Sequence, residues 1–199
     1  MLKTLDMPIL AEFSAKEYKQ KTWTYQDWLN LPDDGNRYEI IEGVLYVTNT
    51  PSIDHQYAVN ELAFQFTDFV KEQDLGYVLT APFGVHLSKD SRPVQPDVLF
   101  IKKDNWPGSG AKFFDGSPDL VVEVLSPSTT RTDRVIKFNA YEKAKISEYW
   151  VIDTKARSVE LYTLSGGGEY ALLGQFIQDE IIESKVLEGI EIVTSSLFM

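Results

Sequence analysis

Apolar residues recur along the first part of the chain with two different periods, which predict both helices and strands. Residues 24–31 predict a short helix, opened by a threonine cap and ended by the Pro-Asp-Asp-Gly turn at 32–35. The stretch 37–47 predicts two strands joined as a hairpin at Glu42-Gly43, because Tyr, Ile and Val dominate it. A helix is expected over about 51–73, where one apolar stripe contains Val59, Leu62, Ala63, Phe66, Phe69 and Val70.

The middle of the chain predicts two strands and a long connection. Residues 77–87 favour a strand with a kink or bulge, because Pro82 and Gly84 interrupt the apolar pattern. Residues 94–101 predict a second strand. Residues 102–117 predict a long loop, since they hold Trp-Pro-Gly, two further glycines and a Phe pair; loops of this length are often functional.

The segment 120–153 predicts a β-α-β unit. Residues 120–125 form a continuous apolar run broken only by Glu123, which is typical of a strand covered on both faces. A helix is expected over about 130–146, because Thr and Asp at its start resemble a capping box. Residues 148–153 predict the next strand, and the short joins predict a right-handed crossover, so the two strands should be parallel.

The remaining pattern completes an α/β fold with a mixed central sheet flanked by helices and an N-terminal β-hairpin extension. Residues 158–164 and 170–177 predict two strands that pair across a triple-glycine turn. A chain of 199 residues with 43% hydrophobic residues can bury one good core. We therefore expect a single domain over 1–199, with its core at about 22–165 and a C-terminal β extension over 166–199.

Composition excludes several kinds of chemistry and of location. The chain has no cysteine, so disulfides, thiolate zinc sites and thiol nucleophiles are all absent, as is common in a reducing cytoplasm. The first residues include Lys3, Asp6 and Pro8, which are unlike a signal peptide. No stretch reaches the length of a membrane span without a charge. We expect a cytoplasmic protein with no membrane partner.

The distribution of charge changes what the net charge implies. A net charge of −11 disfavours a general nucleic-acid binder, because attraction to phosphate requires Lys and Arg. Residues 130–157, however, carry seven basic residues against four acidic ones and are therefore +3, which leaves −14 for the remainder. Within this segment we expect Arg131 and Arg134 to bind DNA. The alternative is that these are solvated helix and turn charges, and charge alone favours that interpretation.

Two carboxylates adjoin apolar strands and are candidates for chemistry. Glu123 lies inside Leu-Val-Val-Glu-Val-Leu, where an ionised group must be neutralised, paired with a cation or bound to a metal. Asp97 follows Pro96 and precedes the apolar run 98–101. If the two strands pair antiparallel, both carboxylates converge, and hard oxygen ligands of this kind suit Mg²⁺ or Mn²⁺.

Lys137 is the candidate cation for the same site. It lies on the expected helix one turn after Asp133, and its long stem can return the ammonium to the strand ends, where it would orient a water or stabilise a phosphate. The alternative leaves the three residues without a catalytic role: Asp97 would end a turn, and Lys137 would form an internal ion pair with Asp133 or Glu123. Asp119 also competes with Asp97, but it shares a strand with Glu123.

Other residue patterns do not form sites. His55 at a helix start and His86 in a strand are too far apart in sequence for a metal-binding pair, which favours capping or packing. The triple glycine at 166–168 lacks the lysine and helix of a phosphate loop. Ser126 and Ser128 have no histidine near them, which argues against a serine hydrolase.

The order of these motifs resembles the Uma-type family of endonucleases, in the restriction-endonuclease-like superfamily with its Pro-Asp…(Asp/Glu)-x-Lys signature. The likeness covers about residues 22–165. The matching stretches are Trp-Thr-Tyr-Gln-Asp-Trp-Leu (23–29), Arg-Tyr-Glu-Ile-Ile-Glu-Gly (37–43), Gln-Pro-Asp-Val-Leu-Phe (95–100), Pro-Asp-Leu-Val-Val-Glu-Val-Leu-Ser-Pro-Ser-Thr (118–129), 133–141 and Glu-Tyr-Trp-Val-Ile-Asp (148–153).

The resemblance implies a restriction-endonuclease-like core and a set of site residues. The Pro-Asp of the signature falls on Pro96-Asp97, and its acidic strand residue falls on Glu123. Leu125 stands where the signature has lysine, so the resemblance implies that the lysine has moved to the following helix, at Lys137. Glu39 matches a further acidic position and is expected as an accessory ligand.

The implied activity is metal-dependent hydrolysis of a phosphodiester in DNA. Asp97 and Glu123 would hold Mg²⁺ or Mn²⁺, and Lys137 would help to activate the attacking water. We also expect a homodimer, because two symmetric sites are the simplest way to cut two strands. Two alternatives stay open: a catalytically silent module that binds DNA or oligomerises on the same fold, and a hydrolase of RNA or small nucleotides.

Overall fold

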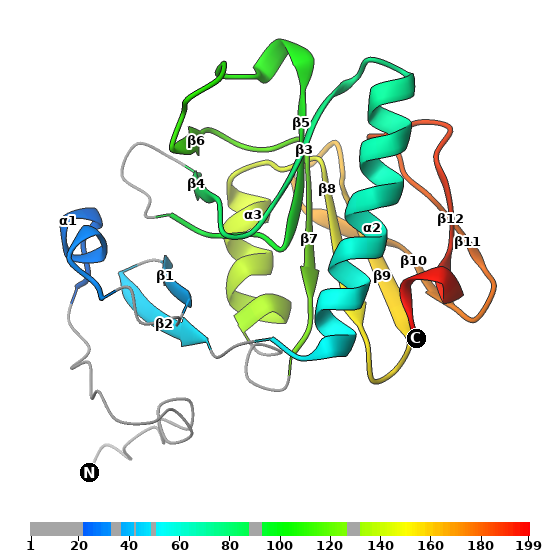
Figure 1. Ribbon diagram of the computed structural model, residues 1–199, viewed down its shortest axis with the longest axis horizontal. Coiled ribbons are helices and arrows are strands. Elements are labelled where there is room, and N and C mark those ends of the chain that lie inside the picture. The colour runs from blue at the N-terminus through cyan, green and yellow to red at the C-terminus, as the bar shows by residue number, and fades with distance from the viewer. Residues whose placement is uncertain (1–21, 33–36, 42, 49–50, 88–92, 127–131) are drawn as a thin grey trace.

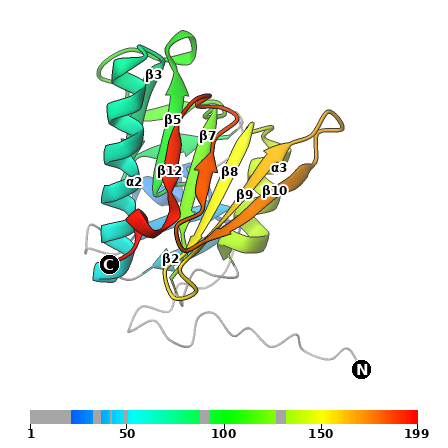
Figure 2. The same ribbon diagram turned by 90° about the vertical axis from the view of Figure 1, so that its right-hand side faces the viewer.

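The computed structural model describes residues 22–32, 37–41, 43–48, 51–87, 93–126 and 132–199. Six strands of this part of the chain form one mixed sheet in the order β10-β9-β8-β7-β5-β3, with helices on both faces (Figures 1 and 2). Their bounds are Gly76–Thr80 (β3), Val98–Lys102 (β5), Leu120–Val124 (β7), Glu148–Asp153 (β8), Ser158–Leu164 (β9) and Tyr170–Ile177 (β10). The expected α/β fold with a mixed central sheet flanked by helices is confirmed.

Strand directions follow from the lengths of the connections. β7 and β8 are parallel and enclose the expected helix, whereas β5–β7, β8–β9 and β9–β10 are antiparallel. Parallel neighbours need a crossover element between them, whereas a short turn such as the one between β9 and β10 forces an antiparallel pair. The predicted parallel pair β7–β8 and the predicted pairing of β9 with β10 are therefore confirmed.

Three small sheets surround the main one. β1 (Arg37–Ile41) and β2 (Val44–Thr48) form the expected N-terminal hairpin. The second sheet pairs β4 (Gly84–His86) with β6 (Phe113–Asp115), and the third pairs β11 (Ile181–Glu183) with β12 (Glu191–Val193). None of the three belongs to the six-stranded sheet, so their position depends on side-chain contacts and loop hydrogen bonds.

The helices begin largely where the capping residues predict. Thr24 and Asp27 form a reciprocal capping box at α1 (Tyr25–Leu29), and the Ser52 hydroxyl accepts from the His55 N–H at the start of α2 (Ile53–Glu72). The segment after β7 is one π-helical turn, η2 (Thr132–Lys137), followed by α3 (Phe138–Lys143). The remaining helical turns are η1 (Lys103–Asn105) and η3 (Thr194–Leu197).

Several expected boundaries differ from the structure. The strand predicted over 77–87 is two strands in different sheets, β3 and β4, separated by a turn at 81–82. The strand predicted from 94 begins only at Val98, because Val94 instead pairs with Val85 in an isolated bridge. The loop over 102–117 contains η1 and β6. The helix expected over 130–146 is described from Thr132 to Lys143, and its first described turn is π-helical. Its expected start at Thr130 lies outside the described residues.

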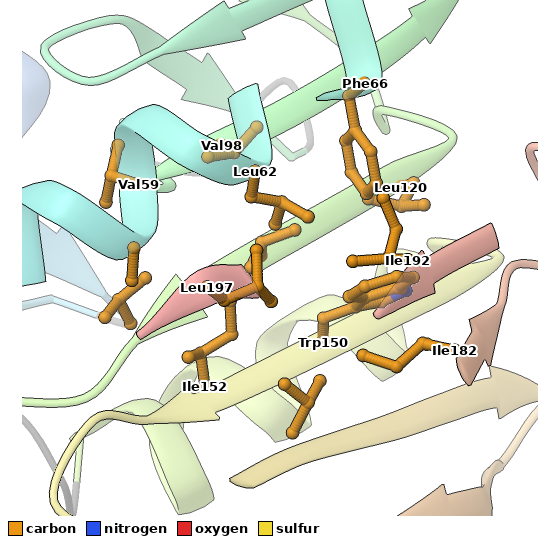
Figure 3. Packing of buried hydrophobic residues seen from close by; sticks show 14 of the residues in the cluster. Val59, Leu62, Phe66, Val98, Leu120, Trp150, Ile152, Ile182, Ile192 and Leu197 are labelled. Atoms are coloured by element: carbon orange, nitrogen blue, oxygen red, sulfur yellow. The ribbon is translucent and has the colours of Figure 1, made fainter. Parts of the chain in front are cut away.

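Alternation along the strands divides the apolar residues between two cores. On one face α2 packs against strand residues and the C-terminal segment, as Figure 3 shows for Leu62, Phe66 and Trp150. The Phe66 and Trp150 rings meet edge to face, 5.3 Å apart. On the other face Tyr141 and Ile146 close a second core below η2 and α3. Strand β10 belongs to the main sheet, and side chains of the C-terminal segment belong to its first core. The sheet and this core therefore both extend past residue 165.

Glu148 fastens the C-terminal segment to the sheet. Its fully buried carboxylate accepts hydrogen bonds from Trp150 Nε1 at 2.6 Å, Ser184 Oγ at 2.7 Å and the Lys185 and Val186 N–H groups at 2.6 and 3.2 Å. A buried charge with several donors is well compensated.

No helix within the described residues is long and apolar enough to cross a lipid bilayer.

Removing this acceptor should loosen the C-terminal segment. We expect Glu148→Ala to lower the free energy of unfolding by about 3 kcal/mol or more, because several buried donors lose their partner. Glu148→Gln keeps one carbonyl oxygen and should lose about half as much. Urea denaturation followed by tryptophan fluorescence measures both. Glu188→Ala, at an exposed position, is the matched control and should change stability by no more than about 0.5 kcal/mol.

Candidate active site

The antiparallel register of β5 and β7 brings two carboxylates to one end of the sheet. Val98 lies opposite Val122, so the next pair outward is Asp97 opposite Glu123. Both side chains are buried, with 3% and 1% exposure. Residues directly opposite each other in an antiparallel pair point to the same face with neighbouring Cβ atoms. The two carboxylates therefore share one face of the sheet at one level.

The ammonium of Lys137 lies among three carboxylates. Its Nζ is 2.9 Å from Glu123 Oε1, 3.2 Å from Glu39 Oε2 and 3.4 Å from Asp133 Oδ1. Lys137 is itself only 2% exposed. The lysine stem thus returns from the helix to the end of β7, as its place after Glu123 predicted.

The π-helical turn presents several side chains to this end of the sheet. Asp133 and Lys137, four residues apart, come from η2, and Tyr141 follows one turn later in α3. The Tyr141 hydroxyl donates to Glu123 Oε1 at 2.6 Å, and the Tyr149 hydroxyl donates to the Asp133 carbonyl oxygen at 3.0 Å. π-Helical turns are rare and occur often at functional sites.

Glu39 joins the cluster from outside the main sheet. It lies in the middle of β1, with 2% exposure, and its Oε1 accepts the Gln95 N–H at 2.7 Å while Oε2 contacts Lys137. These two contacts tie the N-terminal hairpin to the segment before β5 and to η2. The hairpin thereby contributes an acidic group to a centre that it does not reach through any strand pairing.

Burial and repulsion determine the charge of Glu123. Burial raises the pKa of the Glu123 carboxyl well above its usual value; the Lys137 ammonium opposes this shift, and the fields of Asp133, Asp97 and Glu39 add to it. Burial, followed by the Glu123 and Glu39 carboxylates, also raises the pKa of Tyr141 well above 10. Tyr141 thus stays protonated and remains a hydrogen-bond donor to Glu123.

Asp97 has a partner that the sequence did not indicate. His55, in the first turn of α2, places Nε2 3.2 Å from Asp97 Oδ2, and the same oxygen accepts the Val124 N–H at 2.9 Å. The sequence favoured capping or packing for His55, and only its backbone N–H takes part in the cap. The signal available was weak: a polar ring among the apolar positions of α2.

The other candidate residues lie elsewhere or are already paired. Arg131 is outside the described residues. The Arg134 guanidinium donates twice to Glu160, at 2.8 and 2.7 Å, and lies 3.9 Å from Asp153. Asp119, at the opposite end of β7, accepts the Lys102 N–H at 2.8 Å and takes no part in the cluster.

The cluster concentrates oxygen ligands of the kind that hard divalent cations prefer. Four buried carboxylates, from Glu39, Asp97, Glu123 and Asp133, lie beside one lysine ammonium and one histidine. No group of three or more His, Asp or Glu side chains among the described residues is spaced as a ready-made metal cage. Mg²⁺ does not need one, because it commonly takes one or two protein carboxylates together with water and substrate phosphate.

Comparison with known proteins agrees with the fold. Residues 24–195 match the Uma2 family model, described as "Putative restriction endonuclease". A solved protein of Anabaena variabilis ATCC 29413, described as a "putative nuclease", superimposes with a TM-score of 0.74 at 20% sequence identity and covers 88% of this chain and 97% of its own. At this identity the likeness shows a shared fold. Comparison with curated proteins gave no match.

The raised pKa of Glu123 predicts a particular effect of pH on stability. Above about pH 4.5 the unfolded chain ionises this carboxyl while the folded protein resists ionisation, so the wild type loses stability as pH rises toward the folded pKa. Glu123→Gln does not titrate. The free energy of unfolding of this variant, relative to wild type, should therefore increase between pH 4.5 and 8.

Urea denaturation in EDTA at several pH values measures this difference. Glu183→Gln, an exposed carboxyl on β11, is the matched control. A difference between Glu123→Gln and wild type that stays constant with pH would contradict the prediction, because the folded and unfolded pKa of Glu123 would then be equal.

Proposed function

The chain belongs to the Uma2 family, and from this premise we propose that it is a metal-dependent phosphodiester hydrolase, a DNA endonuclease of the PD-(D/E)XK type. One observation carries the proposal: the Lys137 ammonium lies 2.9 Å from Glu123, which stands opposite Asp97 in the register of β5 and β7. Two carboxylates and a lysine at the end of two central strands are the groups that the superfamily signature requires.

This chain departs from the superfamily signature at Leu125, where the signature has lysine. The position of Lys137 supports the proposal that Lys137 replaces that lysine. The signature's lysine would stand on the same strand two residues after the acidic one, where this chain has a leucine that is buried in the second core. Lys137 approaches the same carboxylate from η2 instead. Because catalysis depends on where the ammonium lies and not on which element carries it, Lys137 can take the role.

Each residue has a distinct role in the proposed hydrolysis. Asp97 and Glu123 would hold Mg²⁺ or Mn²⁺, with Glu39 as an accessory ligand; the ion would supply Lewis-acid polarisation of the scissile phosphate. Lys137 would orient the attacking water and stabilise the charge that develops on the phosphate oxygens. Tyr141 donates to Glu123 and would hold that carboxylate in place.

The same observations favour one other function, a catalytically silent module. Glu39, Glu123, Asp133 and Lys137 satisfy one another as internal ion pairs, and each is 2% exposed or less. A cluster of this kind can be purely structural. Metal-dependent cleavage separates the two functions.

We expect the protein to nick or linearise supercoiled plasmid DNA with Mg²⁺ or Mn²⁺ and to be inactive in EDTA. Asp97→Asn and Lys137→Gln should each lower the single-turnover rate about a hundredfold or more, because each removes a group that acts on the transition state. Lys143→Gln removes an exposed lysine of α3 and should cleave as wild type does.

Thermal melts of the same variants distinguish catalysis from structure. If Lys137 only neutralises its neighbours, Lys137→Gln should lose about 3 to 5 kcal/mol of stability and no cleavage should occur in any sample, wild type included. Cleavage of RNA but not DNA would support phosphodiester hydrolysis and would contradict DNA as the substrate.

Contacts to DNA remain a further part of the proposal. Arg131 and Arg134 would bind phosphates of the DNA. Arg134 would have to release Glu160 to do so, because both of its short hydrogen bonds go to that carboxylate. A reversal of both arginines to glutamate should weaken DNA binding and flatten its salt dependence.

We also propose a homodimer that forms through the edge strand β10. Among the described strands, β10 has a sheet neighbour on one side only, and its eight residues include no charged side chain. Leu172, Leu173 and Ile177 are 55%, 42% and 44% exposed. Long apolar edge strands pair readily unless charges or proline protect them, and an antiparallel pair about a two-fold axis satisfies both copies.

Light scattering at micromolar concentration should give the mass of a dimer. Leu172→Lys combined with Leu173→Lys should give a monomer, because two charges would then face each other across the two-fold axis. Phe64→Lys, at an exposed position of α2, is the control and should stay dimeric. A wild-type monomer at this concentration would count against the proposal.

A further inference from the structure

A buried histidine faces the cluster from the α2 side of the sheet. His55 is 7% exposed and stands three residues after Ser52, the cap of α2. Its Nδ1 makes no hydrogen bond with any described residue. Among the described residues, the polar contact of the ring is therefore that of Nε2 with Asp97. Burial of a polar ring is unfavourable unless it makes such a contact.

Neither capping nor packing explains the choice of histidine. The cap uses the backbone N–H of residue 55, which nearly every residue type supplies. Packing alone would favour an apolar side chain, like those of Ala58 and Val59 one turn later. The imidazole therefore has a purpose that depends on Nε2.

That purpose concerns the orientation of Asp97. Asp97 immediately precedes β5. Its Oδ2 accepts from the Val124 N–H, at 2.9 Å, and lies 3.2 Å from His55 Nε2. Contacts from two separate elements, β7 and α2, therefore meet at the same carboxylate oxygen and restrain where it lies.

We propose that His55 is a positioning residue, whose Nε2–H holds Asp97 in the orientation in which it binds the divalent cation. This inference rests on the proposed function, since it assigns Asp97 as a metal ligand. The physical reason is general: carboxylates that bind metals are themselves held by hydrogen bonds, and loss of such a bond typically weakens metal affinity by about 10- to 100-fold.

Mn²⁺ binding without nucleic acid tests the proposal apart from activity. The full chain is titrated with Mn²⁺, and the free ion is counted by electron paramagnetic resonance. Relative to wild type, His55→Ala and His55→Asn should bind about tenfold or more weakly. His55→Gln should stay within about threefold, because a glutamine amide nitrogen reaches about as far as imidazole Nε2, and an asparagine nitrogen does not. His86→Ala, a histidine that contacts Asp115 instead, is the matched control and should bind as wild type.

The outcomes separate this inference from the proposed function. If wild type binds Mn²⁺ and the Asn and Gln variants bind it equally, the positioning role is wrong and the hydrolase proposal stands. If wild type binds no Mn²⁺, the positioning role is wrong, and the plasmid cleavage assay decides the hydrolase proposal separately. A purely structural histidine would lower the melting temperature of the Ala variant and leave the Mn²⁺ affinity of the Asn and Gln variants equal. Should His55→Ala fail to fold, the Asn and Gln pair still decides.

Discussion

The compensation of buried charge at one end of the sheet is the constraint on which the rest of the structure depends. Lys137 and the carboxylates around it are nearly inaccessible to solvent, and none could be ionised there without the others. The hairpin supplies Glu39, the sheet supplies Asp97 and Glu123, and η2 supplies the ammonium. Each element is therefore held in place by its partner's charge as well as by its apolar face. Carboxylates outnumber the lysine, and burial together with the neighbouring carboxylates raises the pKa of the Glu123 carboxyl.

Much of this arrangement could be predicted from the sequence, because local pattern and local chemistry agree there. The period of the apolar residues fixed the order of strands and helices, and the short joins around 120–153 fixed the parallel pair. Glu123 was identifiable because a lone carboxylate in a fully apolar run is costly. The antiparallel pairing that would bring Asp97 to it was a supposition from the sequence, and the register of β5 and β7 places Asp97 opposite Glu123. The helix spacing from Asp133 to Lys137 allowed the lysine to reach the same strand end, and the family resemblance selected it.

The remainder depends on contacts that no local pattern contains. The π-helical form of η2 was missed, because apolar spacing predicts an ordinary helix and the wider turn coincides with buried charges that meet residues far along the chain. The division of 77–87 between two sheets was missed because proline and glycine indicate a bend without indicating where the chain goes next. His55 was missed because its partner lies 42 positions away in sequence, across the sheet.

The ion cluster can form only after widely separated parts of the chain have been translated. Glu39 is translated almost a hundred residues before the lysine that neutralises it, and β8 follows later still. A chain still on the ribosome therefore holds the acidic groups without their counter-charge, and no assembled centre exists until α3 has emerged. The cluster is therefore one of the last parts of the fold to be assembled, because its groups come from segments that are translated far apart.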